Sequence, residues 1–252
     1  MKNTKIEWTE ATWNPSIGCN KVSEGCRNCY AEVMAKRLQA MGVKDYKDGF
    51  VFKILPHRLE IPINVKKPTK FFVDSMSDLF HEKMPDKFLD QIFEVIKKTP
   101  QHTYQILTKR AESMASYFKQ KKVPQNVWLG VTIENKRART RIDSLKDINA
   151  KIRFLSIEPL LEDLGKINLD NIDWAIVGGE SGPKARSMKE KWVLNIKEQC
   201  ERQGTAFFFK QWGSWGADGV RRSKKANGRI LQNKIWNEYP SLSTTPTFPT
   251  LL

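Results

Sequence analysis

VWLGVTIENKRARTRIDSLKDINAKIRFLSIEP, residues 127–159, has the pattern of one strand–helix–strand unit. Its two apolar runs, 127–131 and 152–157, are rich in β-branched and aromatic residues, which is typical of buried strands. Between them lies a basic stretch, 136–145, that we expect to be helical. A strand, a helix and a second strand in this order favour parallel strands joined by a right-handed crossover.

The same alternation continues on both sides of this unit. Further strands are expected at 11–17, 71–73, 104–107, 174–177 and 206–209, and further helices at 86–98, 111–119 and 189–202. With about seven strands in 252 residues, the chain has the usual length of one α/β barrel. We therefore predict a full or partial α/β barrel; a doubly wound open sheet is the alternative.

Two segments do not follow the alternation. Residues 40–70 have no steady period and contain three prolines, so we expect a long connection lying over the barrel. After Trp215 the chain becomes Gly-rich and basic. We therefore divide it into a barrel, residues 1–215, and a basic C-terminal extension, residues 216–252, whose last residues, 241–252, resemble a loose tail.

Polar residues follow six of the expected strands. Because the carboxyl ends of parallel strands meet at one edge, six such segments predict a ring of functional groups around a shared cavity. The segments are Asp74–Asp78, Thr108–Arg110, Thr132–Asn135, Ser156–Pro159, Gly178–Ser181 and Lys210–Trp212.

The charge balance indicates a polyanionic partner. The formal net charge is +15, and neutralised phosphates release counterions, so nucleic acid is the favoured partner over a merely basic surface. The N-terminal residues are polar, and no apolar run approaches the length of a membrane span. We expect a cytoplasmic protein, in which clustered cysteines indicate metal binding or catalysis before disulfides.

Three cysteines, Cys19, Cys26 and Cys29, lie in one loop, residues 18–30, before a helix expected at 30–41. Three thiolates from one loop can hold three irons of a four-iron four-sulfur cluster and leave the fourth iron open. A zinc site is the alternative, with Cys200 as the fourth ligand, and unliganded thiols are a third possibility. Cys200 is in register with the apolar positions of its expected helix, which favours a buried free thiol.

The residues around this loop carry a family resemblance. Lys5–Thr9, Thr12–Pro15, Gly18-Cys19 and Gly25–Glu32 are similar to phage-encoded three-cysteine-motif proteins related to the radical S-adenosylmethionine superfamily. The similarity continues through the polar strand ends and reaches about Pro240. The chain departs from the superfamily pattern in its six-residue gap between the first two cysteines and in Asn28, which stands where an aromatic residue is usual.

The resemblance implies a specific chemistry. The three cysteines would hold the cluster, and its open iron would chelate the amino and carboxylate groups of S-adenosyl-L-methionine. Reductive cleavage would then give methionine and a 5'-deoxyadenosyl radical that abstracts hydrogen from a substrate. A low-potential electron donor, flavodoxin or ferredoxin, and a companion protein encoded nearby are implied as partners.

Candidate contacts for the cofactor come from the strand ends. Carboxylate and hydroxyl groups can receive its polar groups, and Gly178-Gly179 permits close backbone approach, although an ordinary Gly-rich turn explains the same pair. The candidates are Ser77, Asp78, Thr108, Glu134, Glu158, Gly178, Gly179 and Glu180. Asp74, Lys109 and Lys210 are candidate catalytic residues, or members of an ion network.

Aromatic and cationic residues are mixed near the C-terminus, as base stacking and phosphate contact require. The nucleic-acid-binding candidates are Lys210, Trp212, Trp215, Arg221, Arg222, Lys224 and Lys225. A solvated basic hairpin with two packing tryptophans is the alternative. Four other cations, Lys136, Arg137, Arg139 and Arg141, spread around a helix and are expected to form a solvated face.

Together these patterns favour a radical S-adenosylmethionine enzyme that modifies or repairs a nucleic acid base, in a phage or prophage context. One alternative is a metal-stabilised nucleic-acid-binding protein without catalysis. Another is a radical enzyme that acts on a small molecule or a protein.

Overall fold

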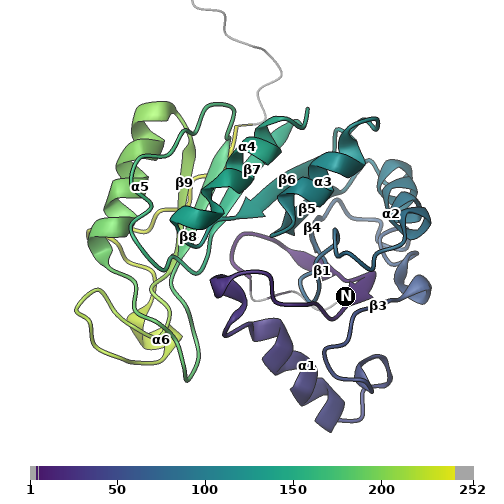
Figure 1. Ribbon diagram of the computed structural model, residues 1–252, viewed down its shortest axis with the longest axis horizontal. Coiled ribbons are helices and arrows are strands. Elements are labelled where there is room, and N and C mark those ends of the chain that lie inside the picture. Colours follow the sequence, from purple (N-terminus) through teal and green to yellow (C-terminus); the bar gives the residue numbers. More distant parts are fainter. Residues whose placement is uncertain (1–3, 5, 242–252) are drawn as a thin grey trace, which may run out of the picture.

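The computed structural model describes residue 4 and residues 6–241 (Figure 1). Seven parallel strands form one curled sheet in the order β1-β4-β5-β6-β7-β8-β9, and β2 pairs with β3 in a separate antiparallel ribbon. The strands are β1 (Ala11–Trp13), β2 (Ser16–Ile17), β3 (Lys53–Ile54), β4 (Lys70–Val73), β5 (Thr103–Thr108), β6 (Val127–Thr132), β7 (Ile152–Ile157), β8 (Trp174–Gly178) and β9 (Ala206–Gln211).

The strand order decides between the two predicted architectures. Each strand of the large sheet pairs with the next one along the chain, all in parallel. A doubly wound sheet would reverse its order at a switch point. The chain is therefore wound in one direction only. Because β1 and β9 lie at opposite edges of the sheet, the barrel is partial, which confirms the α/β barrel prediction in its partial form.

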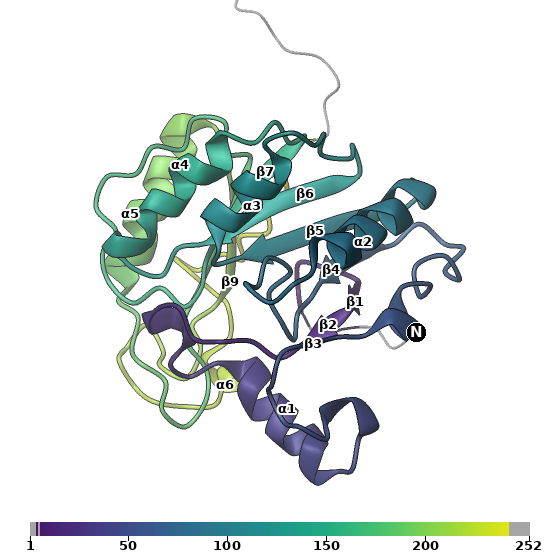
Figure 2. The ribbon, with the colours of Figure 1, turned by 45° about the vertical axis from the view of Figure 1, so that its right-hand side comes forward.

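Helices that follow the strands from β4 onward cover one face of the sheet (Figure 2): α2 (Asp86–Lys98), α3 (Ala111–Phe118), α4 (Thr140–Lys146) and α5 (Glu190–Gln203). Outside this layer are α1 (Tyr30–Ala40), α6 (Lys224–Asn227) and the short 3-10 turns η1 (Glu24–Cys26), η2 (Lys44–Tyr46), η3 (Pro56–Arg58) and η4 (Lys136–Arg139). Figure 2 shows α2 to α5 side by side, whereas α1 stands away from the sheet. Within the described part of the chain, no helix combines the length and the apolarity that a bilayer span requires.

The inner face of the sheet is aromatic at one end and polar at the other. Phe154 and Trp174 are fully buried there, and Trp8 packs against both, with ring centroids 6.4 and 6.2 Å away. Gly130 makes room for this layer, because a Cβ there would lie 2.5 Å from the ring of Phe154. The aromatic layer closes the amino end of the half-barrel, so its mouth is at the carboxyl ends of the strands.

The two long irregular segments cover the edges of the sheet. In residues 40–70, the carbonyl of Arg58 accepts from the indole N–H of Trp13 (2.8 Å), so this connection packs beside β1. In the C-terminal extension, the Phe209 N–H donates to the carbonyl of Trp236 (3.0 Å), which covers the otherwise unpaired edge of β9. The predicted loose tail, 241–252, lies outside the described residues apart from residue 241.

Candidate functional site

The cysteine loop lies across the carboxyl ends of the parallel strands. It begins after β2, where the Gly18 N–H donates to the carbonyl of Met76 (3.0 Å) and the Ser77 hydroxyl donates to the carbonyl of Gly18 (2.7 Å). Gly18 has φ +78, and a Cβ there would lie 2.2 Å from the carbonyl oxygen of Val51. Glycine is therefore required where the loop leaves β2 and passes the end of β4.

At the end of β5, Arg110 connects the loop to a buried carboxylate. Its Nη1 lies 3.5 Å from Cys19 Sγ and 3.1 Å from Asp78 Oδ2, and both the arginine and the aspartate side chain are 8% exposed. Thr108 donates its hydroxyl to the other Asp78 oxygen (2.6 Å). Burial raises the pKa of Cys19 to about 11, against the lowering effect of the Arg110 hydrogen bond. Asp78 and Thr108 thus hold the arginine that contacts the first thiol.

At the end of β6, Glu134 meets the middle of the loop. A Cβ on Gly25 would lie 3.2 Å from Glu134 Oε1, so the loop backbone passes close to this carboxylate. Arg141 donates to Glu134 Oε2 (2.8 Å). Burial opposes ionisation of Glu134, but Lys109 and Arg141 outweigh it and lower the pKa of this carboxyl. Glu134 Oε1 is buried and has no hydrogen-bond partner in the structure.

At the end of β8, Glu180 meets the last part of the loop. Asn28 donates to Glu180 Oε2 (3.1 Å) and to the carbonyl of Lys184 (2.8 Å). Arg186 pairs with Oε1 (2.6 Å) and also reaches the carbonyl of Glu24 (3.1 Å). Although burial opposes it, the hydrogen bonds from Arg186 and Asn28 lower the pKa of Glu180. Asn28 therefore has a structural role at the position where it departs from the superfamily pattern.

Glu158 and Lys210 form a further ion pair at the mouth. Lys210 Nζ lies 2.9 Å from Glu158 Oε1, and a Cβ on Gly178 would lie 2.8 Å from that same oxygen. A Cβ on Gly179 would lie 1.9 Å from the carbonyl oxygen of Trp212. The fold itself therefore requires glycine at 179, where a Cβ would meet backbone, whereas at 178 the Cβ would meet the end of the Glu158 side chain. The predicted contact of both glycines with the cofactor stays a prediction.

Asp74, a candidate catalytic residue, is bound to Ser16. The Ser16 N–H and hydroxyl donate to its two oxygens (3.0 and 2.6 Å), and the residue is 3% exposed. Burial raises the pKa of Asp74 to about 7, against the lowering effect of Ser16. The aspartate thus joins the start of β2 to the end of β4.

The three thiols fit an iron–sulfur cluster by their chemistry. All are free and partly exposed, and the buried Glu134 oxygen beside them lacks a hydrogen-bond donor, such as an ammonium group would supply. Over residues 4 and 6–241, no three Cys, His, Asp or Glu side chains converge as the ligands of a single metal ion do. Thiolates are ligands of both zinc and iron–sulfur clusters.

Cys200, the possible fourth zinc ligand, does not lie at the cysteine loop. It is 0% exposed on α5 and packs in the main core with Val193 and Ile196. Burial raises its pKa to about 12. The expectation of a buried free thiol is confirmed.

The structure corrects part of the predicted nucleic-acid surface. Trp212 is 3% exposed, donates its indole N–H to the carbonyl of Ile230 (2.8 Å) and packs on Phe209, so it has no free face for base stacking. Trp215 is half-buried and donates to the carbonyl of Ala185 (2.7 Å). The basic run Arg221, Arg222, Lys224 and Lys225 is exposed, with Arg222 paired to Asp218 and Lys224 to Glu7.

The structure brings arginines to the site that were not among the site candidates. Arg110, Arg141 and Arg186 each neutralise one strand-end carboxylate, and Asn28 joins the third of these pairs to the loop. Arg110 belongs to a polar strand-end segment, and Arg141 was expected on a solvated face. Arg186 gave no such signal, because its partner Glu180 is known only from the folded chain.

Fold and site together define a class: an α/β protein with a partial barrel of parallel strands and a three-cysteine loop across its carboxyl edge. The model of the family described as "Protein of unknown function (DUF5131)" matches residues 3–240, and the chain belongs to this family. A search of curated proteins found no match.

Solved structures similar to this chain include two of spore photoproduct lyase. One, complexed with dinucleoside spore photoproduct, has 10% sequence identity and a TM-score of 0.40, with 80% of this chain and 64% of that chain covered. The other, a mutant, has 9% identity and a TM-score of 0.46, with 84% of this chain and 78% of that chain covered. The chain thus spans slightly less than two thirds of the first of these lyase chains.

Proposed function

We propose that the chain is a radical S-adenosylmethionine enzyme that holds a four-iron four-sulfur cluster on Cys19, Cys26 and Cys29 and modifies or repairs a nucleic acid base. A cytoplasmic, phage-related origin is part of the proposal, as are a flavodoxin or ferredoxin donor and a companion protein. The observation that carries it is the position of three free thiols on one loop across the mouth of the half-barrel. The net charge of +15 supports the nucleic acid substrate.

When bound and reduced, such a cluster supplies the electron for reductive cleavage of S-adenosylmethionine. The chain's own residues provide the surroundings. Arg110 donates toward Cys19 Sγ, and Glu134 presents an unpartnered oxygen that can accept from an ammonium group. Glu158 and Lys210 bring one carboxylate and one cation to the mouth, where either can orient a polar group of the substrate.

Anaerobic reconstitution with iron and sulfide tests the cluster. The wild-type protein should turn brown with a broad visible absorbance, and dithionite should then release 5'-deoxyadenosine from S-adenosylmethionine. Replacing any one of the three loop cysteines by alanine should lower both the iron content and the release. Cys200→Ala is the matched control, since it removes a buried thiol outside the loop and should keep both.

Three outcomes would contradict the proposal in different ways. A colourless protein with one bound zinc would indicate the binding module without catalysis. If Cys200→Ala lost as much iron as the three loop variants, the loop cysteines would not be the specific ligands of the cluster. If the protein released 5'-deoxyadenosine but did not bind DNA or RNA at moderate salt, its substrate would be a small molecule or a protein.

A further inference from the structure

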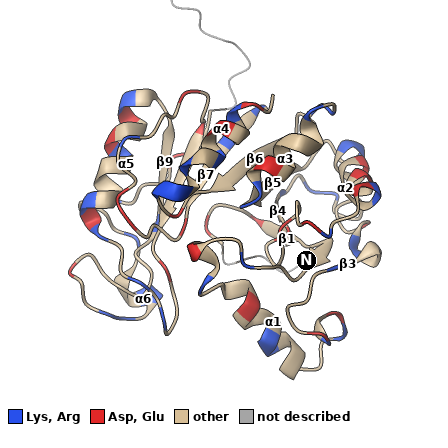
Figure 3. Ribbon diagram, viewed as in Figure 1, with Lys and Arg blue, Asp and Glu red and all other residues tan. Residues whose placement is uncertain are grey.

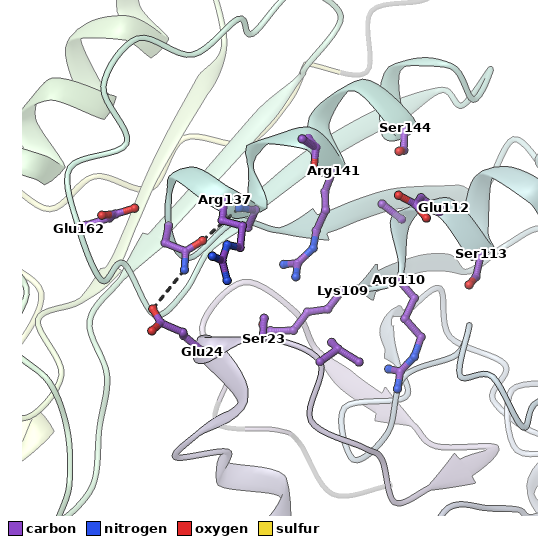
Figure 4. Close-up of a pocket in the computed structure, with 15 residues that line it drawn as sticks. Ser23, Glu24, Lys109, Arg110, Glu112, Ser113, Arg137, Arg141, Ser144 and Glu162 are labelled. Atoms are coloured by element: carbon purple, nitrogen blue, oxygen red, sulfur yellow. Dashed lines mark hydrogen bonds between the residues drawn. The ribbon is translucent and has the colours of Figure 1, made fainter.

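A cavity of about 590 Å³ lies beside the cysteine loop. Its walls come from three segments, with Glu162 at the side (Figure 4). They are residues 22–24 of the loop, residues 109–113 at the start of α3, and Asn135, Arg137, Ala138, Thr140, Arg141 and Ser144 of η4 and α4. This volume is within the usual range for small-ligand pockets. The cavity borders the candidate site, because Arg110 lines it and also contacts Cys19.

Four cationic side chains line this cavity, and they are of two kinds. Arg110 and Arg141 are fixed by ion pairs with Asp78 and Glu134, and Arg141 also donates to the carbonyl of Thr132 (2.7 Å). In the part of the chain that the structure describes, Lys109 and Arg137 form no ion pair within 4 Å. Figure 4 shows Lys109, Arg137 and Arg141 directed toward the space above Ser23.

Neutral donors complete the walls. The first turn of α3 belongs to the lining, and backbone N–H groups of a first turn lack partners within the helix. The hydroxyls of Ser113, Thr140 and Ser144 lie on the same walls. Cations together with N–H and hydroxyl donors form the usual environment of a bound phosphate.

Acidic residues limit how much negative charge the cavity can accept. Glu24, Glu112 and Glu162 also line it, against four cations. Glu24 accepts from Asn135 (3.3 Å) and Glu162 from the N–H of Lys136 (2.6 Å), so both are engaged beside the cations. Asp78 and Glu134 already neutralise Arg110 and Arg141, so Lys109 and Arg137 are the cations left for an anion. Two such cations suit a singly charged phosphodiester better than a pyrophosphate or triphosphate.

We infer that this cavity binds one phosphodiester of a nucleic acid strand, with Lys109 and Arg137 as its direct contacts and Arg141 as a fixed third cation. The inference rests on the nucleic acid substrate of the proposed function and deepens it. A phosphate held here lies next to the cysteine loop, so an adjacent nucleotide can reach the mouth of the half-barrel. The expectation of a solvated face is corrected for Arg141, which is paired with Glu134, whereas Arg137 is exposed, as expected, and lines the cavity from there. Figure 3 shows this group of Lys and Arg positions at the start of α4.

Fluorescence anisotropy with labelled single-stranded DNA and RNA oligonucleotides, on reconstituted protein between 50 and 200 mM salt, tests the inference. Arg137→Gln should weaken binding about tenfold and reduce the slope of log K against log salt by about 0.7. Lys136→Gln is the matched control: it removes one positive charge from the same 3-10 turn but lies outside the cavity, and it should change affinity less than twofold. Lys109→Met should repeat the effect of Arg137→Gln.

Equal effects of Arg137→Gln and Lys136→Gln would overturn the inference, because overall charge would then explain the binding. If a mononucleotide displaced the labelled strand as effectively as an unlabelled oligonucleotide at the same concentration, the cavity would be assigned to a free nucleotide instead. Cleavage of S-adenosylmethionine without an oligonucleotide, measured on the same samples, tests the proposed enzyme activity independently of the proposed phosphodiester site. If cleavage occurs while the two glutamine variants bind alike, only the cavity assignment fails.

Discussion

Replacing Asp74 by asparagine should stabilise the protein, and more so at high pH. The carboxyl is 3% exposed, and its pKa is about 7 in the folded state, above the ordinary value of 3.8. Between these values the folded state holds more protons than the unfolded state, so stability falls as pH rises from about 4 to about 7 and then stays constant. A difference of about three pKa units corresponds to at most about 4 kcal/mol.

Asparagine can keep the contacts of Asp74 without its charge. Its amide oxygen can accept from the Ser16 N–H, and its amide nitrogen can donate to the Ser16 hydroxyl, which lie 3.0 and 2.6 Å from the present oxygens. Asp74 also has φ 55, a left-handed conformation that asparagine adopts readily. We therefore expect the free energy of unfolding of Asp74→Asn to exceed that of the wild type by a few kcal/mol at pH 8 and by much less at pH 5.

Urea unfolding of the metal-free, reduced protein, followed by circular dichroism from pH 5 to pH 8.5, measures this difference. Asp170→Asn removes an exposed carboxylate and serves as the control, with an expected change within about 0.5 kcal/mol at every pH. A difference between Asp74→Asn and wild type that does not vary with pH would show that the buried charge of Asp74 is not what destabilises the folded protein. So would a loss of stability at pH 8.

Two further substitutions test the packing around the site, both by urea unfolding. Arg110→Met should lower stability by about 3 kcal/mol, because it leaves the buried Asp78 carboxylate unpaired, and a change below about 1 kcal/mol would show that water solvates Asp78. Gly130→Ala should lower stability by about 1–3 kcal/mol, since the new methyl group would lie 2.5 Å from the Phe154 ring; an unchanged midpoint would mean that the aromatic layer shifts freely.

Local patterns predicted most of the fold. Each strand and helix expected from residue 71 onward is present within about three residues, because apolar alternation and helical spacing report burial directly. The helix expected at 136–145 is divided into η4 and α4, with Asn135 capping η4 through Ala138 N–H (3.0 Å). Whether the barrel closes depends on contacts between β1 and β9, which no local pattern contains.

The candidate site was predictable only in part. The carboxyl ends of parallel strands must share an edge, so Asp78, Glu134 and Glu180 could be expected near the cysteine loop. Their partners could not, because Arg186 and Asn28 approach Glu180 from positions 6 and 152 residues away. Trp212 was misassigned since a tryptophan among cations has the same sequence pattern whether it packs inward or stacks on a base.

Separate contacts with the strand ends hold three parts of the cysteine loop. Asp78–Arg110 contacts Cys19 itself, Glu134–Arg141 lies against Gly25 beside Cys26, and Glu180–Arg186 binds Asn28 beside Cys29.

Three acid–arginine pairs at different strand ends therefore hold the loop, the first at the Cys19 thiol and the other two at the residues before Cys26 and Cys29. Since the parallel sheet fixes the spacing of those ends, it also fixes the spacing of the three points at which the loop is held. Between Cys19 and Cys26 the loop passes from the end of β5 to the end of β6, so the six-residue gap between these two cysteines bridges two neighbouring anchor points of the sheet.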